Sequence, residues 1–336
     1  MKSWQRSCTR SRNPVMVCTT LAILTMCAAG LSLCVGAVLV SPAELFAKDH
    51  DSVAFRILRY SRLPRTCCSL LAGAALAVSG AVIQSVLSNP LAAPNIIGVN
   101  AGAGFMAALC CAFFPGNLQI LPAASFAGAL LSVLTVLTVS RTAGSSRITL
   151  VLAGVAISSL FSAGTDAILT FVPDALAGYM DFRVGGFSGV TLNQLKAPAV
   201  MIAASMAAVL CMSRSMDILA LGSETAKSLG LSVRPVRLVL LVLAAALAGA
   251  AVSFCGLLGF VGLLVPHIVR RLTGGDALVL LIGSAFGGAL LVTLCDTLAR
   301  SLFSPYELPA GIVLAFIGAP FFLWLLFHQK EGDSCD

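Results

Sequence analysis

Charged side chains are scarce in this sequence. Of its 336 residues only 10% are Asp, Glu, Lys or Arg, whereas 58% are hydrophobic. A soluble globular protein carries about a quarter charged residues, so water is not the solvent around most of this chain. The scarcity excludes a soluble enzyme and indicates a polytopic membrane protein.

Residues that commonly carry enzyme chemistry are few and scattered. The three histidines lie far apart in the sequence, so metal ligation and acid–base catalysis by histidine are not supported. The twelve cysteines include no CxxC pair and lie mostly in apolar stretches, where cysteine behaves as a small hydrophobe. Acidic residues inside apolar segments, the usual sign of a proton or ion path, are limited to Asp166 and Asp296. We therefore expect no enzyme activity and no resident cofactor or metal.

A nucleotide-binding loop is also missing. The segment GSETAKS at 222–228 is similar to one, but it lacks the glycine directly before the lysine and follows no hydrophobic strand. Any ATP that drives this protein must therefore be bound by another chain. The basic residues lie scattered at segment ends, a distribution that reports membrane topology rather than nucleic-acid binding.

Long apolar segments make up most of the chain. At about 20 residues per crossing, they predict an all-α bundle of about ten transmembrane helices in one domain over 1–336, with an N-terminal tail at about 1–14. The first run is too long for a signal-peptide core and is interpreted as an uncleaved crossing. The expected segments lie near 15–40, 65–88, 91–113, 119–140, 148–171, 192–213, 235–253, 254–269, 277–299 and 308–328.

The basic residues sort unevenly between the two sides of this bundle. With the N-terminus in the cytoplasm, ten crossings return the C-terminus there, and thirteen basic residues lie inside against eight outside. The excess agrees with the positive-inside rule. The rule leaves a basic cluster from Arg56 to Arg65 on the outside, which suggests a functional surface. Asp296 and Arg300, one helical turn apart, are expected to pair on one helix face.

The longest polar interruption on the cytoplasmic side, at about 214–237, is rich in leucine. Apolar residues sit among charged ones there, and Gly222 and Gly230 permit turns. A solvated loop would not need so many apolar residues, so the segment predicts one or two short amphipathic helices. We interpret it as a docking surface for a cytoplasmic partner. Elsewhere, small-residue spacings such as Gly98/Gly102 and Gly283/Gly287 predict close helix packing.

Several motifs occur in an order typical of one family. RLPR at 62–65, NPLAAPNIIGVNAGAG at 89–104, GFVGLLVPHIVRRLTGGD at 259–276 and ELPAGIVLAFIGAPFFLWLL at 307–326 resemble the signatures of FecCD-type permeases. Members of this family are the membrane subunits of ABC importers for iron-siderophores, haem and cobalamin. The resemblance covers the chain from Arg59 to Leu326.

The resemblance implies a ten-helix subunit, similar to cobalamin-importer permeases, in a bacterial inner membrane. It implies that the subunit works as a dimer with a second permease copy or a homologue, with the translocation path at the dimer interface. Two cytoplasmic ATPase subunits, a periplasmic or lipoprotein substrate-binding protein, and an iron chelate or corrinoid substrate complete the expected system.

Carried over residue by residue, the resemblance assigns roles to three groups of side chains. Glutamates of the binding protein are expected to meet the outer arginines Arg62, Arg65 and Arg300, where several ion pairs together fix orientation. ATPase coupling is expected at Asp217, Leu219, Leu221, Gly222, Glu224, Ala226, Leu229 and Gly230. The candidate inner gate consists of Asn89, Pro90, Ser145 and Ser146.

The chain departs from the family pattern after the fifth helix. Family members often have a Trp…Gly-Ser pattern where this chain has YMDFRVGGFSG at 179–189, with Tyr179 or Phe182 in the aromatic place. This region is expected to approach the substrate, so siderophore, haem and cobalamin all stay open, with an iron-siderophore favoured. The alternative function is a secondary transporter driven by an ion gradient, which would require mid-membrane ionisable residues that are otherwise absent here.

Overall fold

The computed structural model describes residues 13–36, 52–115, 118–144, 147–274, 276–302 and 306–330. Within these ranges the elements are all helical, which confirms the predicted fold class. Seven helices are long and apolar enough to cross a membrane. They are α1 Pro14–Cys34, the continuous α2 and α3 over Val53–Leu87, α5 Leu121–Thr142, α6 Arg147–Phe171, α8 Leu192–Cys211, α11 Val233–Cys255 and α13 Ala277–Ser301. Two shorter apolar helices, α4 Val99–Phe113 and α14 Ala310–Lys330, support the expected count of about ten only roughly.

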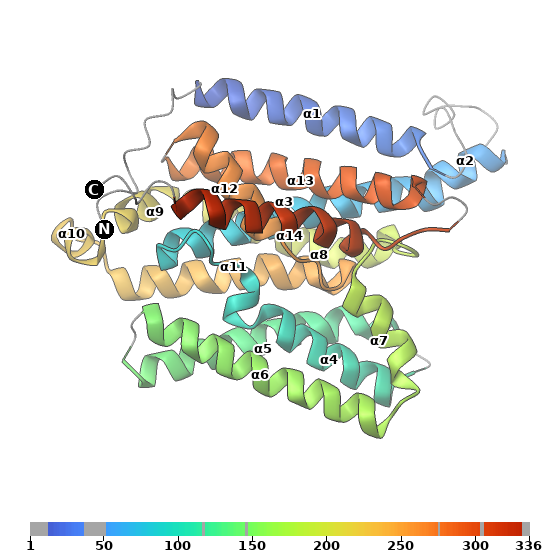
Figure 1. The fold of residues 1–336 in the computed structure, drawn as a ribbon, viewed down its shortest axis with the longest axis horizontal. Helices are drawn as coiled ribbons and strands as arrows, with labels where there is room; N and C mark the ends of the chain where they lie inside the picture. Colours follow the sequence, from blue (N-terminus) through green and yellow to red (C-terminus); the bar gives the residue numbers. More distant parts are fainter. Residues whose placement is uncertain are drawn as a thin grey trace.

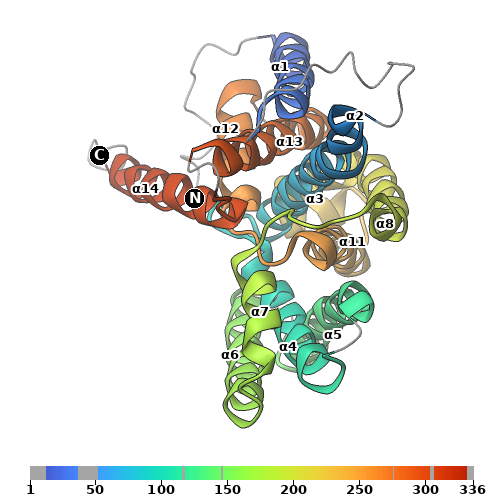
Figure 2. The ribbon, with the colours of Figure 1, turned by 90° about the vertical axis from the view of Figure 1, so that its right-hand side faces the viewer.

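The helices lie side by side along the long axis of the molecule (Figure 1). Helices α3 and α11 form the centre, since 78% of the residues in the most apolar stretch of each are buried. Helices α1 and α13 cover one side of this pair, and α4, α5 and α6 lie on the other (Figures 1 and 2). Helix α1 begins and α14 ends at the end that carries α9 Ser213–Ala220 and α10 Ser223–Ser228.

Two of the expected crossings are shorter and more broken than the sequence suggested. Helix α11 ends at Cys255, since Gly256 with its φ of +70° leaves the helical path, and α12 (Val261–Thr273) begins only five residues further on. The 13 residues of α12 rise about 20 Å, less than the hydrocarbon thickness of about 30 Å. The segment near 254–269 is therefore not one full-length helix. In the same way, a 3₁₀ turn at Pro94–Ile97 precedes α4, so that the helix starts eight residues later than position 91.

Small residues set the spacing of the central helices, as the sequence predicted. A methyl group at Gly73 would overlap the backbone of Gly288 in α13. A Cβ at Gly283 would lie 2.7 Å from Val269 Cγ1 of α12, and one at Gly102 would overlap Gly128 of α5. Helices that approach this closely gain dispersion and backbone contacts that larger side chains would prevent.

Helix α14 projects away from the rest of the bundle on the side of α6 and α7 Ala175–Val184 (Figure 2). Its apolar side chains are largely uncovered, with Phe316 76% exposed and Phe327 71% exposed. Helix α6 likewise exposes Leu152 and Leu160. Lipid or a protein partner must cover an apolar surface of this kind.

Candidate functional site

The outer basic cluster lies on a helix with a local change of pitch. The Ser52 hydroxyl accepts a hydrogen bond from Phe55 N and caps α2 (Val53–Ile57), and a π-helical turn at Leu58–Arg62 leads into α3. The wider turn re-aims the following side chains. Arg56 before the turn and Arg59 within it are exposed, whereas Arg62, Pro64 and Arg65 of the RLPR motif are buried in the bundle.

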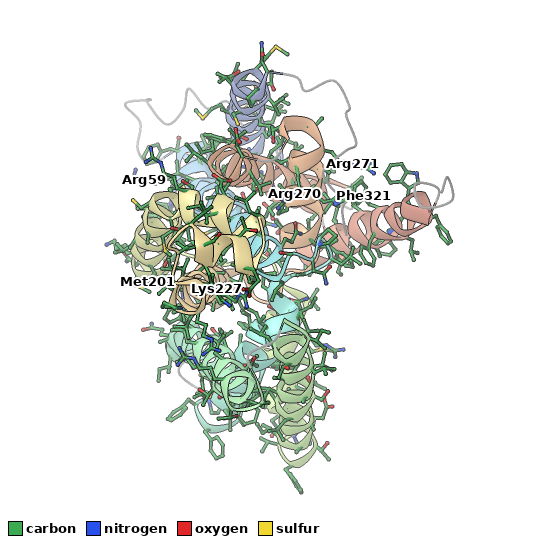
Figure 3. The ribbon with its side chains drawn as sticks, turned by 90° about the vertical axis from the view of Figure 1, so that its left-hand side faces the viewer. Arg59, Met201, Lys227, Arg270, Arg271 and Phe321 are labelled. Atoms are coloured by element: carbon green, nitrogen blue, oxygen red, sulfur yellow. The ribbon has the colours of Figure 1, made fainter. Side chains whose placement is uncertain are left out.

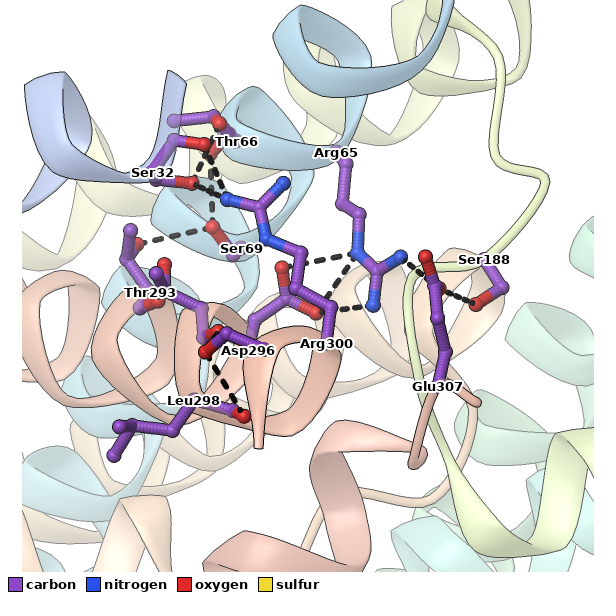
Figure 4. A network of polar contacts seen from close by, with 12 residues as sticks. Ser32, Arg65, Thr66, Ser69, Ser188, Thr293, Asp296, Leu298, Arg300 and Glu307 are labelled. Atoms are coloured by element: carbon purple, nitrogen blue, oxygen red, sulfur yellow. Dashed lines mark hydrogen bonds and ion pairs between the residues drawn. The ribbon is translucent and has the colours of Figure 1, made fainter. Parts of the chain in front are cut away.

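Two carboxylates of unequal exposure share the guanidinium of Arg65 (Figure 4). Arg65 Nε donates to both carboxylate oxygens of Asp296 at 3.0 Å, and Nη2 lies 3.0 Å from Asp296 Oδ1. Arg65 Nη1 donates to Glu307 Oε2 at 2.5 Å. The Asp296 side chain is 0% exposed and that of Arg65 8%, whereas the Glu307 side chain is 46% exposed. The cluster therefore has a buried half and a half that opens to the surface.

The other two arginines hold the end of α1. Arg300 donates to the carbonyl and the hydroxyl of Ser32, and Arg62 donates to the carbonyls of Leu33 and Cys34 at 2.8 and 2.7 Å. Hydroxyl pairs Ser32–Thr66 and Ser69–Thr293 continue this polar layer between helices. Arg62 and Arg300 are 5% and 4% exposed. Inside a bundle such groups need internal partners, because an unpaired buried donor is costly.

The expected pair of Asp296 and Arg300 is wrong. Both residues are on α13, but the described ion pair of Asp296 is with Arg65 of α3. The close approach of α3 and α13 at Gly73 and Gly288 brings Arg65 within reach, while Arg300 extends to α1 instead. A pairing between helices of this kind depends on packing distance, which the i,i+4 rule does not contain.

Sequence reasoning missed three participants in this cluster. Glu307 opens the ELPAG motif and Ser188 lies between α7 and α8; the Ser188 hydroxyl donates to Glu307 at 3.4 Å. The third is Ser32, whose hydroxyl accepts a hydrogen bond from Arg300. An available signal was that Glu307 is an acidic residue in a connection on the same side as the basic cluster.

The opposite end of the molecule carries the predicted amphipathic segment. It forms two short helices, α9 and α10, separated by Gly222 with φ +103° and followed by Gly230 with φ +82°, which confirms the expected helices and turns. Leu219 and Ala226 are buried, whereas Leu221 is 54% and Leu229 60% exposed. Figure 3 shows Lys227, Arg270 and Arg271 on this same end.

The charged residues of this segment differ in their contacts: Asp217 bonds to the bundle, whereas Glu224 and Lys227 pair with each other at the surface. Asp217 accepts a hydrogen bond from Ala277 N at 2.8 Å and so satisfies a free amide at the start of α13. Glu224 and Lys227 form an exposed pair at 2.8 Å. Asp217 thus ties α9 to the bundle, while the leucines on either side of α10 face outward without a partner in the described chain.

The polar break after α3 is a tight turn at this end of the bundle. Ser88 has φ +48°, and Asn89 Oδ1 accepts a hydrogen bond from Leu91 N at 2.9 Å. Nearby, Gln84 Nε2 donates to the carbonyls of Gly262 and Leu263 at 3.3 Å and joins α3 to α12. Pro90 is half-buried in the turn. Ser145 and Ser146 lie outside the described residues.

The aromatic residues of the divergent stretch are packed inside. Tyr179 and Phe182 of α7 are 7% and 6% exposed, and burial raises the pKa of the Tyr179 phenol. The backbone after α7 is fixed by hydrogen bonds from Gly186 N to Cys255 O and from Gly311 N to Gly185 O. These backbone bonds join the end of α7 to α11 and α14, and the Tyr179 hydroxyl lies beside Gly104 of α4, so the stretch is packed in the bundle rather than on an open surface.

Comparison with known proteins agrees with the motifs. Residues 22–328 match the model of the FecCD transport family. The Fe(3+)-citrate import system permease protein YfmE of Bacillus subtilis is 35% identical over 96% of this chain and 98% of that protein. The hemin transport system permease protein HmuU of Yersinia pestis is 36% identical over 94% and 96% of the two chains. The vitamin B12 import system permease protein BtuC of Citrobacter koseri is 38% identical over 97% and 98%.

A solved structure leads to the same conclusion about the fold. It is described as an inward-facing conformation of a metal-chelate type ABC transporter, and it superimposes with a TM-score of 0.83 at 29% identity. The match covers 94% of this chain and 99% of that one. By sequence and by structure, the chain belongs to the FecCD transport family of membrane permeases.

Proposed function

We propose that this permease carries a ferric chelate, with haem and cobalamin as the competing substrates, across a bacterial inner membrane. The observation that carries the proposal is the nearly full-length similarity to permeases named for ferric citrate, hemin and vitamin B12. All three are metal ions held by an organic chelator. The energy comes from ATP bound by separate subunits, because the chain has no phosphate-binding loop of its own.

Two docking surfaces at opposite ends of the bundle support this assignment. The arginine cluster lies at the end with α2, and α9 and α10 lie at the other (Figure 1). We assign the first to a substrate-binding protein on the outside and the second to two ATPase subunits in the cytoplasm. Both the start of α1 and the end of α14 then face the cytoplasm. On the outer face, the exposed Arg56 and Arg59 steer a carboxylate-bearing partner toward Arg65, which lines a surface hollow. Arg62 and Arg300 are buried and bonded to α1, so they support this surface from within.

A second permease copy covers the apolar side of the subunit. Helices α6 and α14 expose large apolar side chains, and α14 stands off the bundle on that side (Figure 2). A dimer through this side would enclose a path between the two copies. The turn at Asn89 and Pro90, at the cytoplasmic end of α3, together with Ser145 and Ser146, forms the proposed inner gate.

The exposed leucines give the first test. Leu221→Asp and Leu229→Asp should each weaken ATPase binding by at least about tenfold, because a carboxylate would be buried in an apolar contact. Co-purification and ATP turnover of the assembled complex measure the effect. Thr142→Asp is the matched control, since it adds the same charge to an exposed position at the end of α5. Normal assembly of both leucine variants would remove the docking role of α9 and α10.

Uptake by proteoliposomes tests the function as a whole. Vesicles that contain the permease and its ATPase are loaded with ATP on the ATPase side and supplied with the binding protein and an ⁵⁵Fe-labelled siderophore, haem or cyanocobalamin. We expect uptake of one of these ligands only when ATP and the ATPase are both present. Uptake driven by an ion gradient without the ATPase would establish the secondary-transporter alternative instead.

A further inference from the structure

We propose that Glu307 is an intramolecular competitor that occupies, on Arg65, the place of a carboxylate from the docking protein. The inference rests on the proposed function, in which a binding protein reaches the outer arginines. In this proposal Glu307 sets the affinity of Arg65 for the docking protein. It also links docking to the start of α14.

The two carboxylates on Arg65 differ in how easily they exchange. Asp296 is fully buried and holds the Nε and Nη2 edge of the guanidinium in a fork of bonds near 3.0 Å. Glu307 holds only Nη1, and nearly half of its side chain is in contact with solvent. A buried carboxylate that accepts several hydrogen bonds from one guanidinium is held firmly, whereas a half-exposed carboxylate with a single bond separates more readily. Glu307 is therefore the member that an incoming carboxylate replaces.

The surface beside Glu307 is shaped to admit such a group. A hollow of about 110 Å³ is lined by Tyr60, Ser61 and Arg65 on one side and by residues 187 and 189–191 on the other. Arg65 is the basic residue in this lining. The single positive charge of Arg65 already faces the carboxylates of Asp296 and Glu307. A third carboxylate that enters the hollow is repelled by Glu307 until the Glu307 side chain moves away from Arg65.

Glu307 also joins three parts of the chain. Through Arg65 it contacts the start of α3, through Ser188 the connection from α7 to α8, and it lies three residues before α14 (Figure 4). The backbone contacts that hold this connection are Leu308 N to Ala299 O and Gly311 N to Gly185 O, both 3.1 Å. Displacing Glu307 removes its side-chain contacts with Arg65 and Ser188 and leaves these backbone bonds in place, so docking outside loosens the start of α14.

The test uses the permease with its ATPase in nanodiscs, titrated with the substrate-binding protein encoded beside the permease gene. Glu307→Gln should lower the dissociation constant about fivefold, because an occupied site reduces apparent affinity by its free fraction. Asp174→Asn is the matched control: Asp174 is exposed at the start of α7, which follows α6, and makes no ion pair with a described residue. It removes the same charge and should change the constant less than twofold.

A second measurement follows the joint itself. Amide hydrogen exchange over residues 307–311 should rise when the wild-type complex binds the partner, and it should already be raised in Glu307→Gln without the partner. Glu307→Asp, whose carboxylate is one methylene shorter, should fall between wild type and Gln in both measurements. Unchanged or weaker binding by a Gln variant that melts like the wild type would overturn the inference. Absence of any binding by the wild type would instead overturn the proposed docking function.

Discussion

Arg65→Leu is expected to lower the free energy of unfolding by about 3–5 kcal/mol, because it leaves the fully buried Asp296 carboxylate without its cation. The loss exceeds what the same change would cause at a surface pair. Breaking one partner of a buried pair strands a charge where water cannot reach it, whereas surface ion pairs contribute about 0–1 kcal/mol. Thermal and denaturant unfolding of the purified permease in detergent measure the difference.

A double-mutant cycle identifies the cause. Arg65→Leu together with Asp296→Leu removes both charges and should recover most of the loss, since a buried pair replaced by apolar residues is often close to neutral. Lys227→Leu is the control at the exposed pair with Glu224 and should cost less than about 1 kcal/mol. Additive effects of the two single substitutions would mean that packing around Arg65, not charge compensation, stabilises this end of the bundle.

The arginine cluster also shows where sequence reasoning stops. The basic cluster from Arg56 to Arg65 can be read directly from the sequence, and so can the motif that contains Arg65. Which of these arginines face solvent depends on the π-helical turn at Leu58–Arg62, and no residue type in that stretch predicts it. The partner of Asp296 depends on how close α3 comes to α13, a tertiary distance that helical spacing along one chain segment does not report.

The segment that forms α9 and α10 was more predictable, because its signals are local. Glycines at 222 and 230 set the turns, and the mixture of leucine and charge over one or two helical turns indicates amphipathic helices. A boundary between two segments was predicted at 253–254, but the structure has a longer break, between Cys255 and Val261. Phe260 adopts a φ of +64° there, an unfavourable conformation for an aromatic residue, and its ring lies against Gly318 of α14. Tertiary contact, rather than local preference, holds that turn.

Gly80→Ala is the second change with a large expected effect, and it tests how closely α3 and α12 must approach. A Cβ at position 80 would overlap the carbonyl oxygen, the carbonyl carbon and the Cα of Gly262. All three are backbone atoms that no rotamer change can move, so the two helices must separate. Overpacking of a tight core costs about 1–3 kcal/mol and sometimes more, and we expect a loss at the upper end of that range.

Separation of α3 from α12 should affect transport as well as the free energy of unfolding. Gln84, one turn beyond Gly80, donates to Gly262 O and Leu263 O, so moving α12 away by the width of a methyl group breaks the hydrogen bonds that join the two helices. Gly30→Ala is the control, because a Cβ there meets nothing within 4 Å and alanine favours the helix by about 0.8–1 kcal/mol. If Gly80→Ala melts and transports like Gly30→Ala, the close contact is not required. If instead the variant folds with a lower melting temperature and slower uptake, transport depends on the close contact between the short helix α12 and α3.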